Sequence, residues 1–226
     1  MNPMIYTSEV GDNGDLIAHV VTMYLKPGDS IADVTYGKGV FWRKIDQTNY
    51  DVHLSDIITG PARYDFRNLP YKKETLNCVI LDPPYCHNPG QMIVDKNYKN
   101  AETTGGMYHN DIIHLYVDGM REAFRVLKTG GYLLVKCKDE IESSYQRWSH
   151  IEIYNAAIDI GFFAEDLFIL TQKSNPIVQH KQQQHARKNH SYLWVFKKPS
   201  EQEKRELKRL RLDGKFGKPL SPPPPK

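Results

Sequence analysis

Four consecutive residues, Asp82-Pro83-Pro84-Tyr85, combine groups that could hold an aromatic amine. They follow an apolar run, residues 76–81, that is typical of a buried strand. The Asp82 carboxylate and the main-chain carbonyl of Pro83 could each accept one N–H of an exocyclic amine, and the proline pair stiffens the backbone between them. The ring of Tyr85 could stack on the attached base, which is worth about 1–3 kcal/mol. The motif therefore predicts chemistry at the exocyclic nitrogen of a nucleobase.

A glycine turn follows the strand expected at 30–35. Gly37 and Gly39 lie in Tyr36-Gly37-Lys38-Gly39, which opens a helix expected near Phe41. Glycines let a backbone approach a ligand closely, although after strands they are often plain turn formers. The third glycine of a dinucleotide fingerprint is missing, which argues against nicotinamide or flavin binding.

Two further acids lie where a nucleoside could be held. Asp56 follows the strand expected at 52–55 and could accept both ribose hydroxyls, or simply cap a turn. Asp65 and Phe66 could grip an adenine amine and face, or form an Asx-type turn with Phe66 as core filler. Ligands of open parallel sheets bind beyond the carboxyl ends of the strands, so we expect these residues and the 82–85 motif at one edge.

Strand and helix patterns alternate along the chain, which predicts a mostly parallel sheet with helices on both faces. The continuous apolar run Val79-Ile80-Leu81 agrees with burial on both sides. Helices are expected at 16–25, 112–127, 145–160 and 201–212, and the remaining strands at 132–137, 162–170 and 192–196.

At 226 residues and 26.2 kDa, the chain is expected to form one domain with attachments. We expect no membrane span and no signal peptide, and three cysteines without paired spacing favour a reduced, cytoplasmic compartment. The net charge of +3 is uneven: residues 197–226 hold ten Lys/Arg and four Asp/Glu, and residues 171–190 hold four Lys/Arg and no acid. Two basic segments on a mildly acidic body suit a polyanion, although basic tails are often simply solvated.

Two loops, 86–111 and 171–190, are long enough to be lids or binding loops. Gly105-Gly106 could hinge the first, and Gln182-Gln183-Gln184 with basic neighbours suits contacts to phosphates and base edges. The spacing of His180, His185 and His190 does not favour a metal site. The tail, 199–226, ends in a polyproline-like extension.

The chain resembles the S-adenosylmethionine-dependent DNA amino-methyltransferases, which modify N6 of adenine or N4 of cytosine. Residues 82–85 match the family's catalytic motif in full, and residues 33–39 are similar to its cofactor motif, with Tyr36 where phenylalanine is more usual. Residues 120–135 resemble its helix and glycine turn before the fifth strand. The resemblance covers about residues 15–198. It implies a Rossmann-like class I methyltransferase fold with a mostly parallel seven-stranded sheet, in a methyltransferase domain over 1–198.

The resemblance also implies the reaction and its residues. A methyl group would pass directly from S-adenosylmethionine to nitrogen, without a covalent enzyme intermediate, so Cys86 is expected to be a bystander. The flipped base would be held by Asp82, Pro83, Pro84 and Tyr85, and the cofactor by Asp33, Tyr36, Gly37, Gly39, Asp56, Asp65 and Phe66. The expected substrate is N6 of adenine in DNA, because the motif ends in tyrosine.

Several alternatives stay open. The same motif would serve N4 of cytosine or an amine in RNA, and a catalytically silent nucleic-acid-binding subunit could keep the fold, although the intact Asp82 and glycine turn argue against it. Sequence-specific members usually carry a target recognition domain, for which the chain has no room. Specificity is therefore expected to be short, shared across a homodimer, or supplied by a separate partner.

Overall fold

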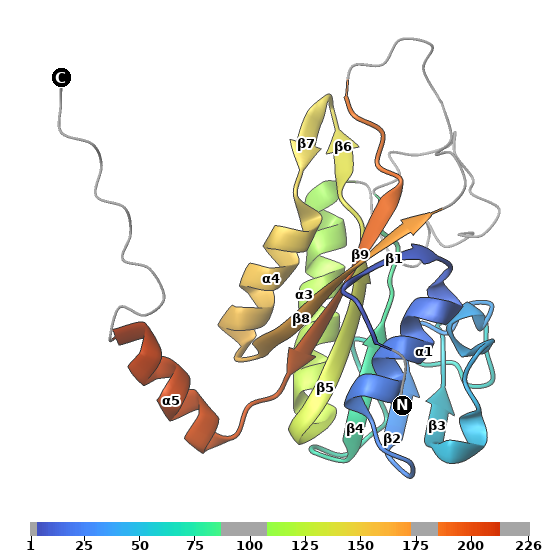
Figure 1. Ribbon diagram of the computed structural model, residues 1–226, viewed down its shortest axis with the longest axis vertical. Helices are drawn as coiled ribbons and strands as arrows, with labels where there is room; N and C mark the ends of the chain where they lie inside the picture. Colours follow the sequence, from blue (N-terminus) through green and yellow to red (C-terminus); the bar gives the residue numbers. More distant parts are fainter. Residues whose placement is uncertain (1–3, 87–107, 173–184, 213–226) are drawn as a thin grey trace.

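The computed structural model describes residues 4–86, 108–172 and 185–212. Its main feature is a seven-stranded sheet in the order β1-β8-β9-β5-β4-β2-β3 (Figure 1). Strand β9 is antiparallel to β5 and β8, and the other neighbours are parallel, so the predicted mostly parallel sheet is confirmed. The strands are β1 Ser8–Gly11, β2 Ser30–Asp33, β3 Asp51–Leu54, β4 Leu76–Leu81, β5 Leu127–Cys137, β8 Phe163–Gln172 and β9 His190–Lys197.

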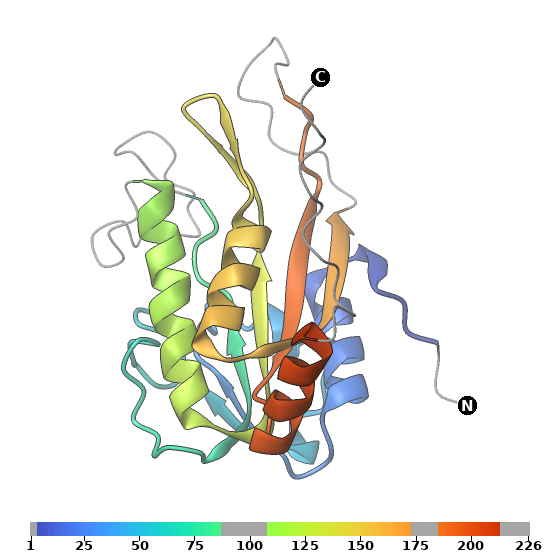
Figure 2. The same cartoon turned by 90° about the vertical axis from the view of Figure 1, so that its left-hand side faces the viewer.

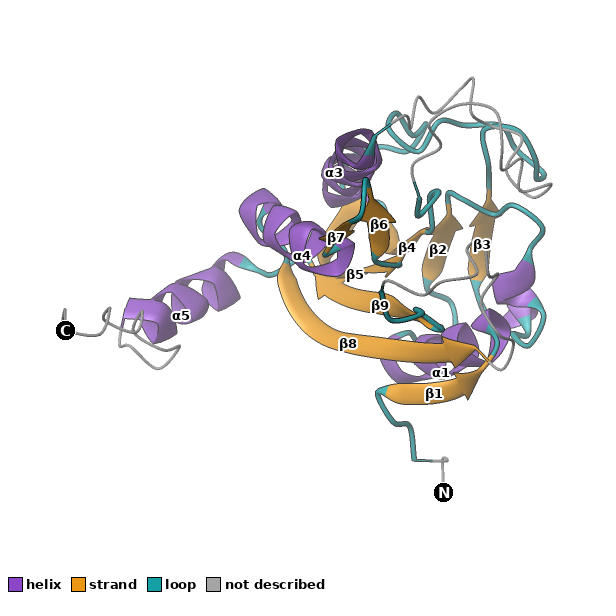
Figure 3. Ribbon diagram, turned by 90° about the horizontal axis from the view of Figure 1, so that it is seen from above, coloured by secondary structure: helices purple, strands orange, loops and turns teal. Residues whose placement is uncertain are grey.

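Helices cover both faces of the sheet, as predicted (Figure 3). Helix α1 (Asn13–Tyr24) packs on one face, and helices α3 (His109–Val126) and α4 (Ser149–Ile160) pack on the other. The alternation of side chains in a strand explains both layers. In β4, Cys78 and Ile80 join the core under α1, whereas Val79 and Leu81 join the core under α3 and α4.

Several features differ from the predicted elements. The helix expected near Phe41 is only a 3₁₀ turn, η1 (Val40–Trp42), and a second one, η2 (Gln47–Asn49), precedes β3. Strand β1 was not predicted; it adds a parallel edge strand beside β8. Strand β5 begins at Leu127, so the glycine turn expected to separate helix from strand lies within the strand.

The start of the helix predicted at 145–160 is instead a β-hairpin. Strands β6 (Glu140–Glu142) and β7 (Tyr145–Arg147) pair antiparallel, and α4 begins only at Ser149. Ser143 and Ser144 connect them with φ of 50° and 68°. Two positive φ values suit a two-residue hairpin turn, but glycine or asparagine usually marks such a turn, so a Ser-Ser pair gave no signal.

The predicted basic helix at 201–212 is α5 (Glu201–Leu212). It is set apart from the helices on the sheet in Figures 1 and 3. Reciprocal bonds cap it, because Ser200 N donates to Glu203 Oε2 at 2.7 Å and Glu203 N donates to Ser200 Oγ at 3.2 Å. Among the described residues, no helix combines the length and the hydrophobicity of a membrane span.

The topology creates one edge at which ligands of such sheets bind. The chain leaves β2 for β3 on one side and returns to β4 on the other side, so the strand order reverses between β2 and β4. Both glycines of the turn and the 82–85 motif follow these two strands. Figure 2 shows the hairpin β6–β7 rising from the same edge.

Candidate active site

Asp33 is the last residue of β2 and is 1% exposed. Its Oδ1 accepts a hydrogen bond from Thr35 N at 3.1 Å, and its Oδ2 accepts one from Trp42 Nε1 at 2.8 Å. The carboxyl group thus braces both ends of the glycine turn. Burial raises the pKa of Asp33 to about 7, and the negative charges of Asp82 and Asp56 act in the same direction.

The turn itself depends on its glycines. Gly37 and Gly39 have φ of 53° and 67°, values that side chains rarely adopt. The phenol ring of Tyr36 lies over Gly39, where a Cβ would collide with it. At Gly37 a Cβ would meet only one atom within 4 Å, the carbonyl oxygen of Thr35 at 3.8 Å. The backbone at Gly37 is therefore open to a ligand, whereas Gly39 makes room for Tyr36.

Asp56 lies beside this turn. Its Oδ2 accepts a hydrogen bond from Gly37 N at 3.1 Å, and its Oδ1 accepts bonds from Ile58 N at 2.9 Å and Thr59 N at 3.0 Å. The structure therefore brings Asp56 and the glycine turn together, and it shows the turn-capping bonds that were the alternative role. Binding of ribose by this carboxylate stays a prediction.

Asp65 and Phe66 have the arrangement of the alternative interpretation, in which Asp65 forms an Asx-type turn and Phe66 fills the core. Asp65 Oδ1 accepts a bond from Arg67 N at 2.9 Å, and the Arg67 guanidinium, 2.6 Å from Asp65 Oδ2, lowers the pKa of this carboxyl. Phe66 is 7% exposed and packs against α3 so closely that a Cβ at Gly119 would be 2.9 Å from its ring. The grip of this pair on adenine stays a prediction, without an open ring face to support it.

Asp82 directly follows β4, and its carboxyl group has an unused acceptor. Asp82 Oδ1 is buried and has no hydrogen-bond partner in the described part of the chain. Burial raises the pKa of Asp82, whereas the charge of Lys136 and a hydrogen bond with Tyr85 lower it. An acceptor atom enclosed without a donor is what an incoming amine would satisfy.

The structure surrounds the motif with residues that the sequence did not single out. Lys136 of β5 is 1% exposed; its Nζ donates to Ser191 Oγ at 2.6 Å and lies 5.5 Å from the centroid of the Tyr85 ring. Asp82 N donates to Thr35 Oγ1 at 2.7 Å. A lysine inside the apolar run 132–137 is the signal that could have identified one of them, because lysines are almost never buried without a partner.

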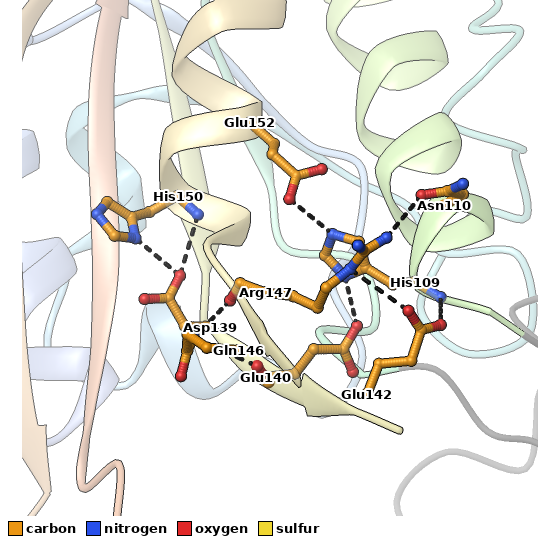
Figure 4. Close-up of polar contacts among 9 residues, drawn as sticks. All are labelled: His109, Asn110, Asp139, Glu140, Glu142, Gln146, Arg147, His150 and Glu152. Atoms are coloured by element: carbon orange, nitrogen blue, oxygen red, sulfur yellow. Dashed lines mark hydrogen bonds and ion pairs between the residues drawn. The ribbon is translucent and has the colours of Figure 1, made fainter. Parts of the chain in front are cut away.

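The hairpin is fixed to the rest of this edge by a buried histidine (Figure 4). His109, at the start of α3, is 0% exposed and lies between Glu140 and Glu152, with Nδ1 at 2.7 Å and Nε2 at 3.1 Å from their carboxylate oxygens. Its main-chain N–H donates to Glu142 at 2.8 Å. Each ring nitrogen thus lies within hydrogen-bond distance of an acid, one from β6 and one from α4.

A second histidine fixes the other side of the hairpin (Figure 4). His150 Nδ1 lies 2.7 Å from Oδ1 of Asp139, which is 3% exposed, and the His150 ring stacks on Tyr192 of β9 with centroids 4.1 Å apart. The hairpin, α3, α4 and β9 therefore form one connected polar framework at the carboxyl edge.

Some predictions lie outside the described residues. These include most of both long loops, with Gly105-Gly106, His180 and Gln182-Gln183-Gln184, and the end of the tail. Of the three histidines considered for a metal site, His185 and His190 are described, and His190 contacts Tyr192 Oη at 3.0 Å. The described residues contain no group of three or more His, Cys, Asp or Glu side chains that could hold a metal ion.

The comparisons with known proteins decide the family. A family model described as DNA methylase, for N6 and N4 amines, matches residues 76–218, more than half of the chain. The chain belongs to this DNA methylase family. S-adenosylmethionine is the methyl donor of the family, and the matched region includes Asp82 to Tyr85. No curated protein matches the sequence.

Solved structures share the fold of this DNA methylase. An S-adenosylmethionine-dependent methyltransferase of Methanosarcina mazei has 13% identity over 80% of this chain and 98% of its own, with a TM-score of 0.51. TrmN of Thermus thermophilus has 15% identity over 82% of this chain and 48% of its own, with a TM-score of 0.54. A candidate methyltransferase of Bacillus halodurans has 17% identity over 81% of this chain and 99% of its own, with a TM-score of 0.51. These likenesses confirm the predicted class I methyltransferase fold.

The geometry fits the cofactor. Gly37 N donates to Asp56, and the charges of Asp56 and Asp82 act on the buried carboxyl group of Asp33, so three acids lie close together at this edge. S-adenosylmethionine carries a positively charged sulfonium, which such a group of acids attracts. The residues at this edge can therefore hold the methyl donor next to the catalytic motif.

Proposed function

We propose that this DNA methylase transfers a methyl group from S-adenosylmethionine to N6 of adenine in DNA. The observation that supports this most strongly is the enclosed, unpartnered Oδ1 of Asp82. It lies beside the glycine turn because Thr35, within that turn, bonds to the main chain of Asp82. The preference for adenine over cytosine comes from the tyrosine at the end of the motif, by resemblance to the family.

The residues of the motif would act on the base and not on the methyl group. When bound, S-adenosylmethionine supplies an electrophilic methyl. Asp82 Oδ1 and the Pro83 carbonyl would accept the two N–H bonds of the amine, so that its lone pair points at the methyl donor. Pro84 keeps the backbone stiff, and stacking on Tyr85 would offset the few kcal/mol needed to extrude the base.

The residues expected at the cofactor would have different roles. The main chain at Gly37 would approach the cofactor directly, and Gly39 would let Tyr36 fold over the turn. Asp33 would act indirectly, because both carboxylate oxygens already brace the turn. Asp56 would bind ribose hydroxyls with the carboxylate that now caps the neighbouring loop.

DNA is the substrate class of the family, and we propose that the basic segments 171–190 and 199–226 contribute phosphate contacts. The methyltransferase domain would span 1–198, since β9 ends at Lys197 and α5 begins at Glu201. Target specificity would be short, or shared with a second copy or another protein. A DNA substrate fits the proposed cytoplasmic location.

Labelled transfer tests the proposal. Purified protein is incubated with methyl-tritiated S-adenosylmethionine and unmodified DNA, and the DNA is digested to nucleosides and separated. We expect label in N6-methyldeoxyadenosine. Label in N4-methyldeoxycytidine, or in RNA only, would replace the substrate with one of the alternatives. Absence of label from all nucleic acids, with normal cofactor binding by calorimetry, would instead indicate a silent nucleic-acid-binding subunit.

A further inference from the structure

We propose that Lys136 is a positioning residue of this DNA methylase: it is the buried counter-ion of Asp82 and fixes the ring of Tyr85. The proposal rests on the proposed function, since it explains how the motif is kept ready for the amine. Lys136 lies outside the motif, on the neighbouring strand β5.

Four polar residues lie on one face of four neighbouring strands, or directly after the strand in the case of Asp82. The register pairs Leu81 with Val135, so the next residues, Asp82 and Lys136, are side by side. Both continue the face that carries Ile80 and Leu134 in the core under α1. Asp33 in β2 and Ser191 in β9 continue the same face, next to Ile31 and Leu193. The line they form is diagonal, because Asp33 pairs with Ile80 and Lys136 pairs with Leu193. It consists of an acid, a second acid, a cation and a hydroxyl group.

Burial makes this cation and Asp82 depend on each other. A buried ammonium and a buried carboxylate are each costly unless they are paired. Burial lowers the pKa of Lys136 while the charge of Asp82 raises it, and burial raises the pKa of Asp82 while the charge of Lys136 lowers it. Each charge therefore favours the ionised form of the other group, and only an ionised Asp82 offers both oxygens as acceptors.

The other titratable groups around Lys136 and Asp82 do not replace the effect of these two charges on each other. The charge of Asp82 raises the pKa of Asp33, and Cys137 and Lys138 have smaller effects on the pKa of Lys136 than Asp82 has. Ser191 Oγ accepts a hydrogen bond from Nζ at 2.6 Å and so fixes the end of the lysine. In the described part of the chain, Lys136 is the one lysine over the Tyr85 ring.

The contact with Tyr85 sets the orientation of its ring. Nζ lies 5.5 Å from the ring centroid, within the range of a cation–π interaction. One face of the ring is thereby occupied by the ammonium. The same cation would therefore orient the acceptor and the stacking ring together.

Two measurements on the full-length protein test the proposal. In the first, the Asp82 carboxyl is titrated by ¹³C NMR in wild type, Lys136→Met, Ser191→Ala and the control Lys128→Met. Methionine keeps the length of the side chain but removes the charge, and Lys128 is an exposed lysine on the same strand. We expect the Asp82 midpoint to rise by about one pH unit or more in Lys136→Met, by less in Ser191→Ala, and not in Lys128→Met.

In the second, kcat/KM for methyl transfer is measured from pH 5.5 to 9. The acidic limb of the pH profile of kcat/KM should move to higher pH in Lys136→Met. The shift should equal the rise in the Asp82 midpoint that NMR gives for the same variant. A uniform fall in rate with an unmoved limb and an unmoved Asp82 midpoint would overturn the proposal and leave Lys136 a structural residue. If Lys136→Met does not fold, Ser191→Ala decides by the same criteria. Because the titration requires no turnover, failure of the proposed function and failure of this inference are distinguishable.

Discussion

The main-chain N–H of Asp82 donates a hydrogen bond to the hydroxyl of Thr35 at 2.7 Å. Thr35 N in turn donates to Asp33, so three residues connect the glycine turn after β2 to the catalytic motif after β4. These two segments would carry the methyl donor and the base. A direct transfer requires the two reacting atoms to be aligned closely, so this bond sets the distance on which the rate depends.

Replacing Thr35 by valine should slow transfer without abolishing cofactor binding. Valine has the shape of threonine but no acceptor, so Asp82 N loses its partner and the two segments lose their connection. We expect kcat to fall by about 10- to 100-fold, with cofactor affinity changed only a few fold. Thr35→Ser keeps the hydroxyl and is the matched control. Equal kcat in valine and serine variants would remove this role.

The ring of Tyr85 should be replaceable only by another aromatic ring. Tyr85→Ala would lose base stacking of about 1–3 kcal/mol, roughly a 5- to 150-fold loss in kcat/KM, whereas Tyr85→Trp should largely retain it. The measurement is steady-state transfer to duplex DNA. If alanine and tryptophan variants were equally active, stacking would not be the function of this residue.

Asp33 should make the protein less stable as the pH rises. Its folded pKa of about 7 lies above the ordinary value of 3.8, so between these values the folded state holds a proton that the unfolded chain has released. Stability from this group is therefore greatest at low pH and is lost as the pH rises toward 7. Urea unfolding at pH 5 and 8 should show a larger decrease in wild type than in Asp33→Asn. The same decrease in both would contradict the raised pKa.

His109 should contribute strongly to stability. Its ring is 0% exposed and faces Glu140, whose side chain is 4% exposed, so His109→Ala removes a buried hydrogen-bond partner of this acid. We expect a loss of about 3 kcal/mol in the free energy of unfolding. Glu152→Gln changes the more exposed partner, at 39%, and should lose below about 1 kcal/mol. A His109→Ala variant as stable as wild type would show that the framework in Figure 4 is not stabilising.

The sequence predicted the parts of the fold that depend on local pattern. Strand β4 has the predicted limits, because a continuous apolar run bounded by proline indicates a buried strand, and α5 has its predicted limits as well. The 82–85 motif could be interpreted because its chemistry lies in adjacent residues. Phe66 was ambiguous, since the same Asp-Phe pair suits a turn or a ligand.

What could not be predicted depends on neighbours that are distant in sequence. Lys136 acquires meaning only when the register places it beside Asp82, and His109 only when the hairpin and α4 bring Glu140 and Glu152 to its ring. The hairpin could not be predicted, because its turn consists of two serines with positive φ, a conformation that the sequence does not indicate. The pairing of β6 with β7 and the contacts of Glu140 and Glu142 with His109 stabilise the hairpin that this turn closes.

Long-read sequencing of DNA from cells that express the protein tests the central claim most directly. With the wild-type chain, the claim predicts methylated adenines at one recurring short site. With Asp82→Ala, which removes the carboxylate and leaves the glycine turn in place, it predicts that the modification disappears while purified variant still binds S-adenosylmethionine within a few fold of wild type. The same sites modified to the same extent by Asp82→Ala would contradict it.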